Sequence, residues 1–229
     1  MMQILVFVLS ANPFYEANFT SLPIRSISVF TNPAGLGIKR GAESYFTYHP
    51  GRLTNASSLC NFGLGIAKMD SVTYYEAGLG LRLPGAFSFG YAYQFDIKDY
   101  GVSRHIFGLI CHPSPNLSLG YKTTVGDRYH MFGGISIRPF REYVTISCDI
   151  EYEGVDSILH CYYGTMIQPL DGVQLNCHAD KEFNWNAGIE LIFGKIKLAG
   201  AYSNVDKKFS GGIIISAQSY KNLNYAYRQ

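Results

Sequence analysis

The strongest constraint on the fold is an alternating stretch at positions 73–96, which reads TYYEAGLGLRLPGAFSFGYAYQFD. On both sides of its Pro-Gly pair, a bulky apolar side chain occupies almost every second position, as in a β-strand with two unlike faces. The alternation continues for roughly ten residues on each side, the length that a tilted strand needs to cross the hydrocarbon of a bilayer. Because strands of soluble proteins are usually nearer five or six residues, the stretch predicts two transmembrane strands.

The same pattern predicts how these two strands pair. A turn at Pro84, Gly85 and Ala86 places apolar residues opposite one another, as Tyr75 with Phe95, Leu79 with Tyr91 and Leu81 with Phe89. The opposite face is polar or small, with Glu76 facing Gln94, Gly78 facing Ala92 and Gly80 facing Gly90. In an outer-membrane barrel the bulky face contacts lipid and the polar face lines the lumen.

Composition excludes several classes of protein. Charged residues make up 16% of the chain, below the usual quarter, and aromatic residues make up 15%. No run approaches the length of a transmembrane helix, and a net charge of +2 without a basic cluster argues against nucleic acid as a partner. The five cysteines are odd in number and form no C-x-x-C, so we expect neither a disulfide framework nor zinc. They fall on apolar strand phases, where cysteine is a small hydrophobe: Cys60, Cys111, Cys148, Cys161 and Cys177.

The first residues resemble part of a signal peptide. Residues 1–11, MMQILVFVLSA, hold a short apolar core followed by small residues, which predicts cleavage after Ala11. The basic region that usually precedes such a core is missing, since the first cation is Arg25. The alternative interpretation is a hydrophobic first strand.

A motif ahead of the first clear strand resembles a known family. It consists of Ser26, Phe30, Asn32, Pro33, Ala34, Gly35 and Leu36. This pattern is similar to the N-terminal signature of FadL-like and PorV/PorQ-like outer-membrane β-barrels. The resemblance implies that residues 12–42 form a hatch or plug inside the lumen, with Phe30, Asn32, Pro33, Ala34, Gly35 and Leu36 as its motif. Residues 43–229 would then form the barrel. The motif taken alone is also what a turn opening a short helical segment looks like.

Alternation continues along most of the remaining chain. It predicts an all-β fold, an antiparallel up-and-down transmembrane β-barrel of about 12–14 strands. Thirteen strands can be placed directly, and a fourteenth is expected from residues 223–227 or from residues 24–30. Proline or glycine turns, among them Pro50-Gly51 and Pro84-Gly85, alternate with acidic polar turns. We assign the first kind to the periplasmic rim and the second to the outside.

Two sets of residues should face the lumen. The polar phase of the strands predicts a lining of Glu76, Arg82, Gln94, Asp96, Lys122, Arg138, Asp149, Glu151, Asp180 and Glu190. A glycine strip is expected from Gly63, Gly65, Gly78, Gly80 and Gly90. Interior glycine marks close approach of another backbone, so we expect residues 12–40 to pack on the strip; the alternative is that glycine eases barrel curvature.

No group of residues predicts catalysis. Asp149 and Glu151 share a lumen face and paired carboxylates can act as acid and base, but pairing with Arg138 or Lys122 is the simpler expectation. His178 and Asp180 also share a face, without a third metal ligand. The Gly-x-Gly pairs Gly63/Gly65 and Gly78/Gly80 lie inside strands, which fails the context of a nucleotide loop. We expect no enzyme, no metal and no cofactor.

The leading functional prediction is a barrel of the bacterial outer membrane, with outer-membrane lipid as its surroundings. The family resemblance implies passage of hydrophobic small molecules, or a secretion-accessory role with a secretion-machinery protein as partner. A second prediction is a structural or anchoring barrel segment of a larger protein, such as one ahead of a signal-peptide-peptidase domain. A third is a soluble ligand-binding β-barrel, which requires the two faces to be inverted.

Overall fold

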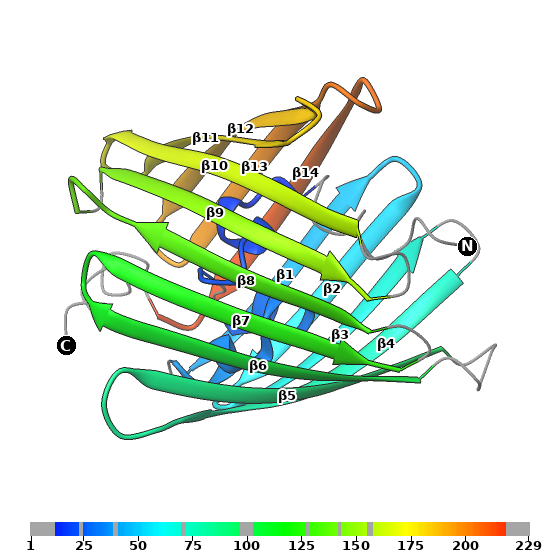
Figure 1. Ribbon diagram of the computed structural model, residues 1–229. Helices are drawn as coiled ribbons and strands as arrows, with labels where there is room; N and C mark the ends of the chain where they lie inside the picture. Colours follow the sequence, from blue (N-terminus) through cyan, green and yellow to red (C-terminus); the bar gives the residue numbers. More distant parts are fainter. Residues whose placement is uncertain are drawn as a thin grey trace.

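The computed structural model describes residues 12–22, 25–38, 41–69, 72–96, 103–126, 129–141, 143–154 and 158–218. Its strands form one closed antiparallel barrel, in which each strand pairs with its neighbours in the chain and β1 pairs with β14 (Figure 1). The strands are β1 (Ala42–His49), β2 (Arg52–Leu59), β3 (Phe62–Met69), β4 (Val72–Arg82), β5 (Phe87–Asp96), β6 (Ser103–Ser114), β7 (Leu117–Val125), β8 (His130–Ile137), β9 (Val144–Glu153), β10 (Ile158–Leu170), β11 (Val173–Asp180), β12 (Trp185–Phe193), β13 (Ile196–Ser203) and β14 (Lys208–Ser216). The predicted fold class is confirmed.

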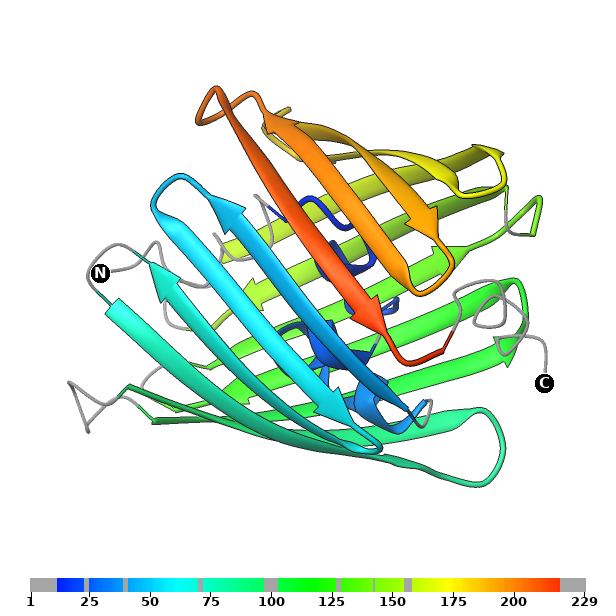
Figure 2. The same cartoon turned by 180° about the vertical axis from the view of Figure 1, so that it is seen from behind.

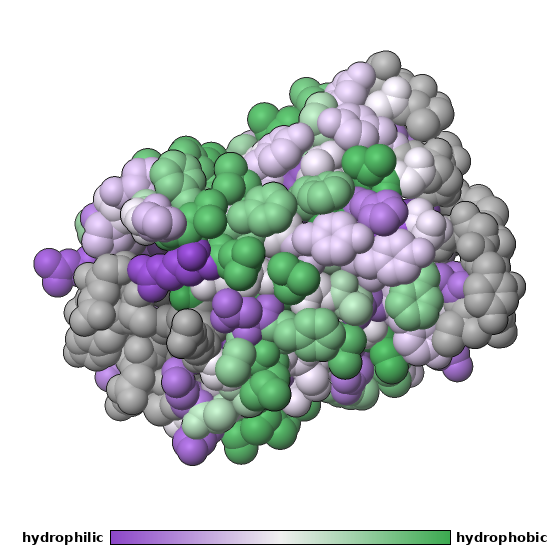
Figure 3. Space-filling model, turned by 90° about the horizontal axis from the view of Figure 1, so that it is seen from below, coloured by the Kyte–Doolittle hydropathy of each residue, from purple (hydrophilic) through white to green (hydrophobic). Residues whose placement is uncertain are grey.

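The bulky side chains of the strands point outward and the polar ones point inward. Leu64 and Leu81 are about half exposed, whereas the side chain of Glu151 is completely buried. Figure 3 shows one face of the barrel, with apolar side chains spread over much of its described surface. These faces are the reverse of those that a soluble ligand-binding barrel would need. The predicted pairing of β4 with β5 is also confirmed, including Tyr75 with Phe95 and Leu79 with Tyr91.

The strand count is fourteen because the sequence analysis missed one turn. Residues 52–69 form two strands, β2 and β3, joined at Cys60 and Asn61, and Leu59 pairs directly with Phe62. Cys60 has a φ of 54°, the left-handed conformation that a tight hairpin turn requires. Cys60 is therefore a turn residue and does not lie on the apolar phase of a strand.

The fourteenth strand does not come from residues 24–30. Arg25–Thr31 is the helix α2, and β1 already pairs with β14, so the closed barrel offers no free edge for another strand. Residues 223–227 and the predicted signal peptide, residues 1–11, lie outside the described residues.

The extra turn also changes the grouping of the turns. We call the rim at which β1 begins and β14 ends the entry rim; the turns after β2, β4, β6, β8, β10 and β12 lie there. The other rim is called the far rim. The Pro84-Gly85 turn lies at the entry rim, but Pro50-Gly51 joins β1 to β2 at the far rim, together with the acidic turns. The predicted strict alternation of turn types is therefore wrong at Pro50-Gly51.

Residues 12–22 and 25–38, called the N-terminal segment below, lie inside the barrel. They form η1 (Tyr15–Asn18), α2 (Arg25–Thr31) and η2 (Pro33–Gly37), which the strands surround in both Figure 1 and Figure 2. Helices this short are not stable alone, so the walls must hold them. Among the described residues, no helix has the length and apolarity that a membrane-crossing helix needs.

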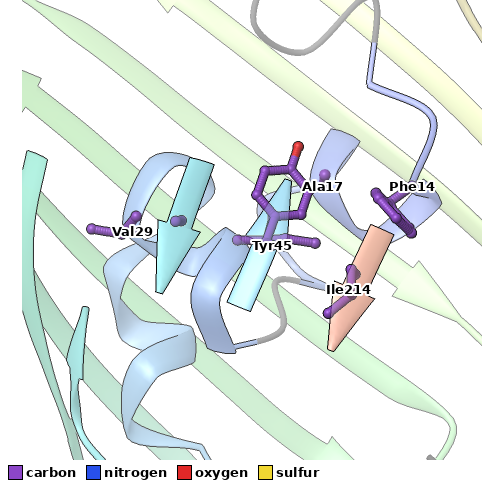
Figure 4. Packing of buried hydrophobic residues seen from close by; sticks show 7 residues of the cluster. Phe14, Ala17, Val29, Tyr45 and Ile214 are labelled. Carbon is purple, nitrogen blue, oxygen red and sulfur yellow. The ribbon is translucent and has the colours of Figure 1, made fainter. Parts of the chain in front are cut away.

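Apolar contacts hold part of the N-terminal segment to the wall. Phe14, Ala17 and Val29 belong to one buried cluster with Tyr45 of β1 and Ile214 of β14 (Figure 4). The Phe14 and Tyr45 rings lie 5.7 Å apart between centroids, and both residues are at most 1% exposed. Since burying one large apolar side chain is worth about 1.5–3 kcal/mol, this cluster favours a seated segment.

The segment also contacts the pair of strands that closes the barrel. Glu43 of β1 is the register partner of Ser216 of β14. Ser26 donates to Glu43 Oε1 from its hydroxyl at 2.7 Å, and Arg25 Nη1 donates to Ser216 Oγ at 2.9 Å. Two consecutive residues of the segment therefore bind the two sides of one cross-strand pair.

Candidate functional site

Wall carboxylates accept hydrogen bonds from the backbone of the N-terminal segment. The Tyr15 amide donates to Glu190 Oε1 of β12 at 2.7 Å, and the Thr20 amide donates to Asp149 Oδ2 of β9 at 2.7 Å. The Ser26 amide donates to Glu43 Oε1 at 3.2 Å. Hydrogen bonds to charged acceptors are among the stronger ones in proteins. The three acceptors are placed around the barrel, so they fix the segment from several sides.

An ion pair adds a further contact between segment and wall. Lys197 of β13 places Nζ 2.8 Å from Glu16 Oε1 of the segment and 2.9 Å from Glu190 Oε2. The side chain of Lys197 is 2% exposed and that of Glu190 is 0% exposed. Burial raises the pKa of the Tyr15 hydroxyl above its ordinary value, so Tyr15 stays neutral.

A row of inward serines on the wall binds Ser21, near the end of residues 12–22. Ser118 Oγ donates to the Ser21 carbonyl, and the hydroxyls of Ser21 and Ser136 lie 2.6 Å apart. Ser136 is in turn 2.6 Å from Ser147. These serines occupy one register row across β7, β8 and β9. The sequence analysis missed them, although their inward phase could have been read from the alternation.

The predicted motif residues lie together at the second half of the segment. Phe30 is in α2, Asn32 precedes η2, and Pro33, Ala34, Gly35 and Leu36 form η2. Asn32 is completely buried; its Nδ2 donates to the Thr20 carbonyl at 2.9 Å and to the Tyr121 carbonyl of β7 at 3.2 Å. Its Oδ1 accepts from the Ala34 amide at 3.2 Å, which caps η2. Asn32 thus joins both halves of the segment to the wall.

The glycine strip lies against these motif residues. A Cβ atom at Gly63 would stand 2.9 Å from Leu36 Cδ2, and one at Gly78 would stand 3.3 Å from Leu36 Cδ1. A Cβ at Gly65, Gly80 or Gly90 would overlap with Phe30, Gly37 and Pro33, respectively. The strip continues beyond the predicted five residues, because Gly108 lies against Asn32, Gly120 against Thr20 and Gly164 against Phe19.

The predicted lining residues fall into two groups. Those near the middle of the barrel are buried: Glu76, Lys122, Asp149, Glu151 and Glu190. Those at or beyond strand ends are Arg82, Asp96, Arg138 and Asp180, and Gln94 lies beside them near the end of β5. The expected pairing of Asp149 and Glu151 with lumen cations gives way to other contacts. Asp149 accepts from Thr20, while Glu151 accepts from Tyr162 at 3.0 Å and lies 3.4 Å from His130.

His178 and Asp180 do not form a common site. His178 Nε2 lies 2.9 Å from Asn186 Nδ2, whereas Asp180 accepts hydrogen bonds from Glu182 and Asn184 in the far-rim turn. Within the part of the chain that the structure describes, no group of three or more potential ligands could hold a metal ion.

The buried charges show that the lumen is filled at this level. Glu151 and Glu190 are 0% exposed, Asp149 is 1% exposed and Lys197 is 2% exposed, although all four project from the inner wall. In a water-filled pore, inward charged side chains contact water. Here the N-terminal segment and other wall side chains cover them.

The architecture matches solved membrane barrels. Omp33 of Acinetobacter baumannii superposes with a TM-score of 0.57 over 79% of this chain and 99% of that chain, at 9% identity. A triple mutant of the porin of Rhodopseudomonas blastica superposes with a TM-score of 0.50 over 77% of this chain and 98% of that chain, at 8% identity. The fold is that of an outer-membrane β-barrel.

Sequence comparison adds no family to this structural match. A scan against protein-family models finds no matching family, and a search of curated proteins finds no matching relative. The matched barrels include a porin and Omp33, and the resemblance to FadL-like and PorV/PorQ-like barrels stays a prediction.

Proposed function

We propose that this outer-membrane-type barrel is a closed channel of the bacterial outer membrane, which passes small polar solutes when its N-terminal segment is displaced. The observation that carries the proposal is the burial of charged side chains on the inner wall by that segment. The N-terminal segment, residues 12–22 and 25–38, is in this proposal the plug, and β1 to β14 form the wall. The porin fold of the matched structures supports a channel and gives no support to an enzyme.

The lengths of the turns at the two rims support an orientation. The chain enters β1 and leaves β14 at the entry rim, where turns such as Cys60-Asn61 and Gly194-Lys195 are two residues long. Two-residue connections make up four of the six at the entry rim and two of the seven at the far rim, where β5 and β6 are joined by residues 97–102. Short turns face the periplasm in bacterial outer-membrane barrels, so we place the entry rim there and the far rim outside.

The nature of the wall favours polar solutes. Around the segment the inner wall carries charged, hydroxyl and glycine positions beside buried apolar ones such as Phe132 and Ile214. A hydrophobic molecule passing the polar positions would strip water from them at a cost. Passage of hydrophobic molecules and a secretion-accessory role, which the family resemblance implies, stay predictions. Under the anchoring prediction the lumen would stay closed whatever happened to the segment.

Displacing the segment without changing any charge tests the proposal. Gly90→Leu adds a side chain where Pro33 already lies, so the segment cannot keep its place. Gly133→Leu is the matched control, because a Cβ at Gly133 meets nothing within 4 Å. Each purified protein is reconstituted in a planar bilayer in KCl. We expect Gly90→Leu to conduct and both Gly133→Leu and the unmodified chain to stay closed.

Two further measurements make the result decisive. Heat-modifiable gel mobility shows that each variant has formed a barrel. A variant lacking residues 12–38 provides a second way to empty the lumen. If folded Gly90→Leu and the shortened barrel both fail to conduct, the channel proposal is wrong and an anchoring role is favoured.

A further inference from the structure

We propose that wall carboxylates which the N-terminal segment covers make the opened lumen select cations. This inference rests on the proposed function and names its class of solute. The carboxylates are Glu76 of β4, Asp149 and Glu151 of β9, and Glu190 of β12.

The charge of the inner wall is uneven along its height. Leaving aside the first two and last two residues of each strand, the inward charged side chains are Glu76, Asp149, Glu151, Glu190 and Lys122. With Lys197, whose Nζ lies 2.9 Å from Glu190 Oε2, these four carboxylates and two ammonium groups give a formal charge of −4 + 2 = −2. Inward arginines such as Arg52, Arg82 and Arg104 lie within two residues of a strand end, where the barrel opens toward its rims. The middle of the wall is therefore acidic.

These carboxylates occur on well-separated strands. Asp149 accepts a hydrogen bond from the Thr20 amide of the segment, and Glu190 accepts one from the Tyr15 amide. When the segment leaves, both carboxylates lose these donors. Glu190 keeps Lys197 as a neighbour, but Lys197 loses its second carboxylate, Glu16.

One of these carboxylates, Glu76, is buried with one of its oxygens unsatisfied. Glu76 is 2% exposed, and its Oε1 makes no hydrogen bond to any residue that the structure describes. Its other oxygen, Oε2, lies 3.4 Å from Gln94 Nε2. An unpaired oxygen of this kind is costly in the closed state, so Glu76 gains from contact with water or a cation.

An opened lumen changes the state of these groups. Carboxylates in contact with water are ionised at neutral pH. Rings of Asp and Glu in a narrow pore attract cations and exclude anions, and low-dielectric walls strengthen the field. Asp149 and Glu190, which bind the segment in the closed protein, would thus join Glu76 and Glu151 in the selectivity ring of the open one.

The opened variant Gly90→Leu tests this inference through its reversal potential in a KCl gradient. We expect K⁺ to permeate better than Cl⁻. Combining Gly90→Leu with Asp149→Asn and Glu190→Gln should lower the K⁺/Cl⁻ permeability ratio several-fold. The matched control is Asp171→Asn, which removes one carboxylate from an exposed entry-rim turn and should leave the ratio unchanged.

The outcomes separate this inference from the proposed function. A conducting Gly90→Leu that prefers Cl⁻ or shows no preference overturns cation selectivity and leaves the channel intact. A Gly90→Leu variant that never conducts overturns the channel itself. If the neutralised variant does not insert, block of the Gly90→Leu current by spermine decides instead, because a cation-selective ring binds the polyamine and an unselective lumen leaves the current unblocked.

Discussion

Removing the ammonium of Lys197 should release the first half of the N-terminal segment. Lys197→Met keeps most of the side-chain volume but leaves Glu190, which is 0% exposed, without its ion-pair partner 2.9 Å away. Glu16 loses its partner at 2.8 Å in the same step. Because Glu190 also receives the Tyr15 amide, the perturbation acts directly where wall and segment meet.

The size of the effect follows from the burial of the pair. Breaking a buried ion pair by removing one partner costs about 3–5 kcal/mol, largely because the remaining charge is left uncompensated. Glu190 lies on the wall and meets water only if the segment moves, so this cost falls on the seated state. With tenfold in population for each 1.4 kcal/mol, the displaced state should gain roughly a hundred- to a few-thousand-fold.

Hydrogen exchange followed by mass spectrometry measures this release directly. In folded barrels in detergent, amides of residues 12–22 should exchange about a hundred-fold faster or more in Lys197→Met. Lys181→Met is the control, since Lys181 is exposed and donates to the Leu159 carbonyl at the far rim. Adding Glu190→Gln should restore part of the protection, because the uncompensated charge is then gone. Unchanged exchange of residues 12–22 in folded Lys197→Met would refute the reasoning.

Three further predictions address other parts of the barrel. Asn32→Ala leaves the buried Thr20 carbonyl without its amide donor, a loss of about 1–3 kcal/mol that should appear as faster exchange over residues 25–38. Leu109→Arg puts a charge on the outer face near the middle of β6 and should destabilise the barrel in vesicles by about 2–4 kcal/mol in urea unfolding; an unchanged midpoint would contradict a lipid-facing Leu109. In membranes, Cys60 should react with charged maleimides because it lies in a turn, whereas Cys161, on a strand, should react only with lipid-soluble ones; equal labelling of both would count against the assigned faces.

Period-two alternation was sufficient to predict the class of fold and the direction of each face. It also predicted the exact register of β4 and β5, because the odd-length turn at Pro84, Gly85 and Ala86 fixes which residues share a face. The turn at Cys60 and Asn61 was missed because it contains neither glycine nor proline. Without this turn, residues 52–69 resemble one long strand, and the error carried over to the strand count and to the rim of Pro50-Gly51.

The lumen was predicted less completely than the wall. Glycines on one phase indicated where another backbone approaches, because a missing side chain is visible in the sequence. The partners of Asp149, Glu190 and the serine row were not visible, since they depend on the path of residues 12–38 across the lumen. That path contains no periodic pattern from which distant contacts could be read.

The contacts of Arg25 and Ser26 affect the register in which β1 and β14 pair, and this register sets the shear of the closed barrel. In an antiparallel wall, sliding the last strand by two residues preserves the inward and outward faces, so alternation alone does not forbid it. Such a slip would move Ser216 about 7 Å along β1, away from Glu43. The adjacent side chains of Arg25 and Ser26 could then no longer bind both residues. The N-terminal segment therefore favours the correct register of β1 and β14 over the register that is shifted by two residues.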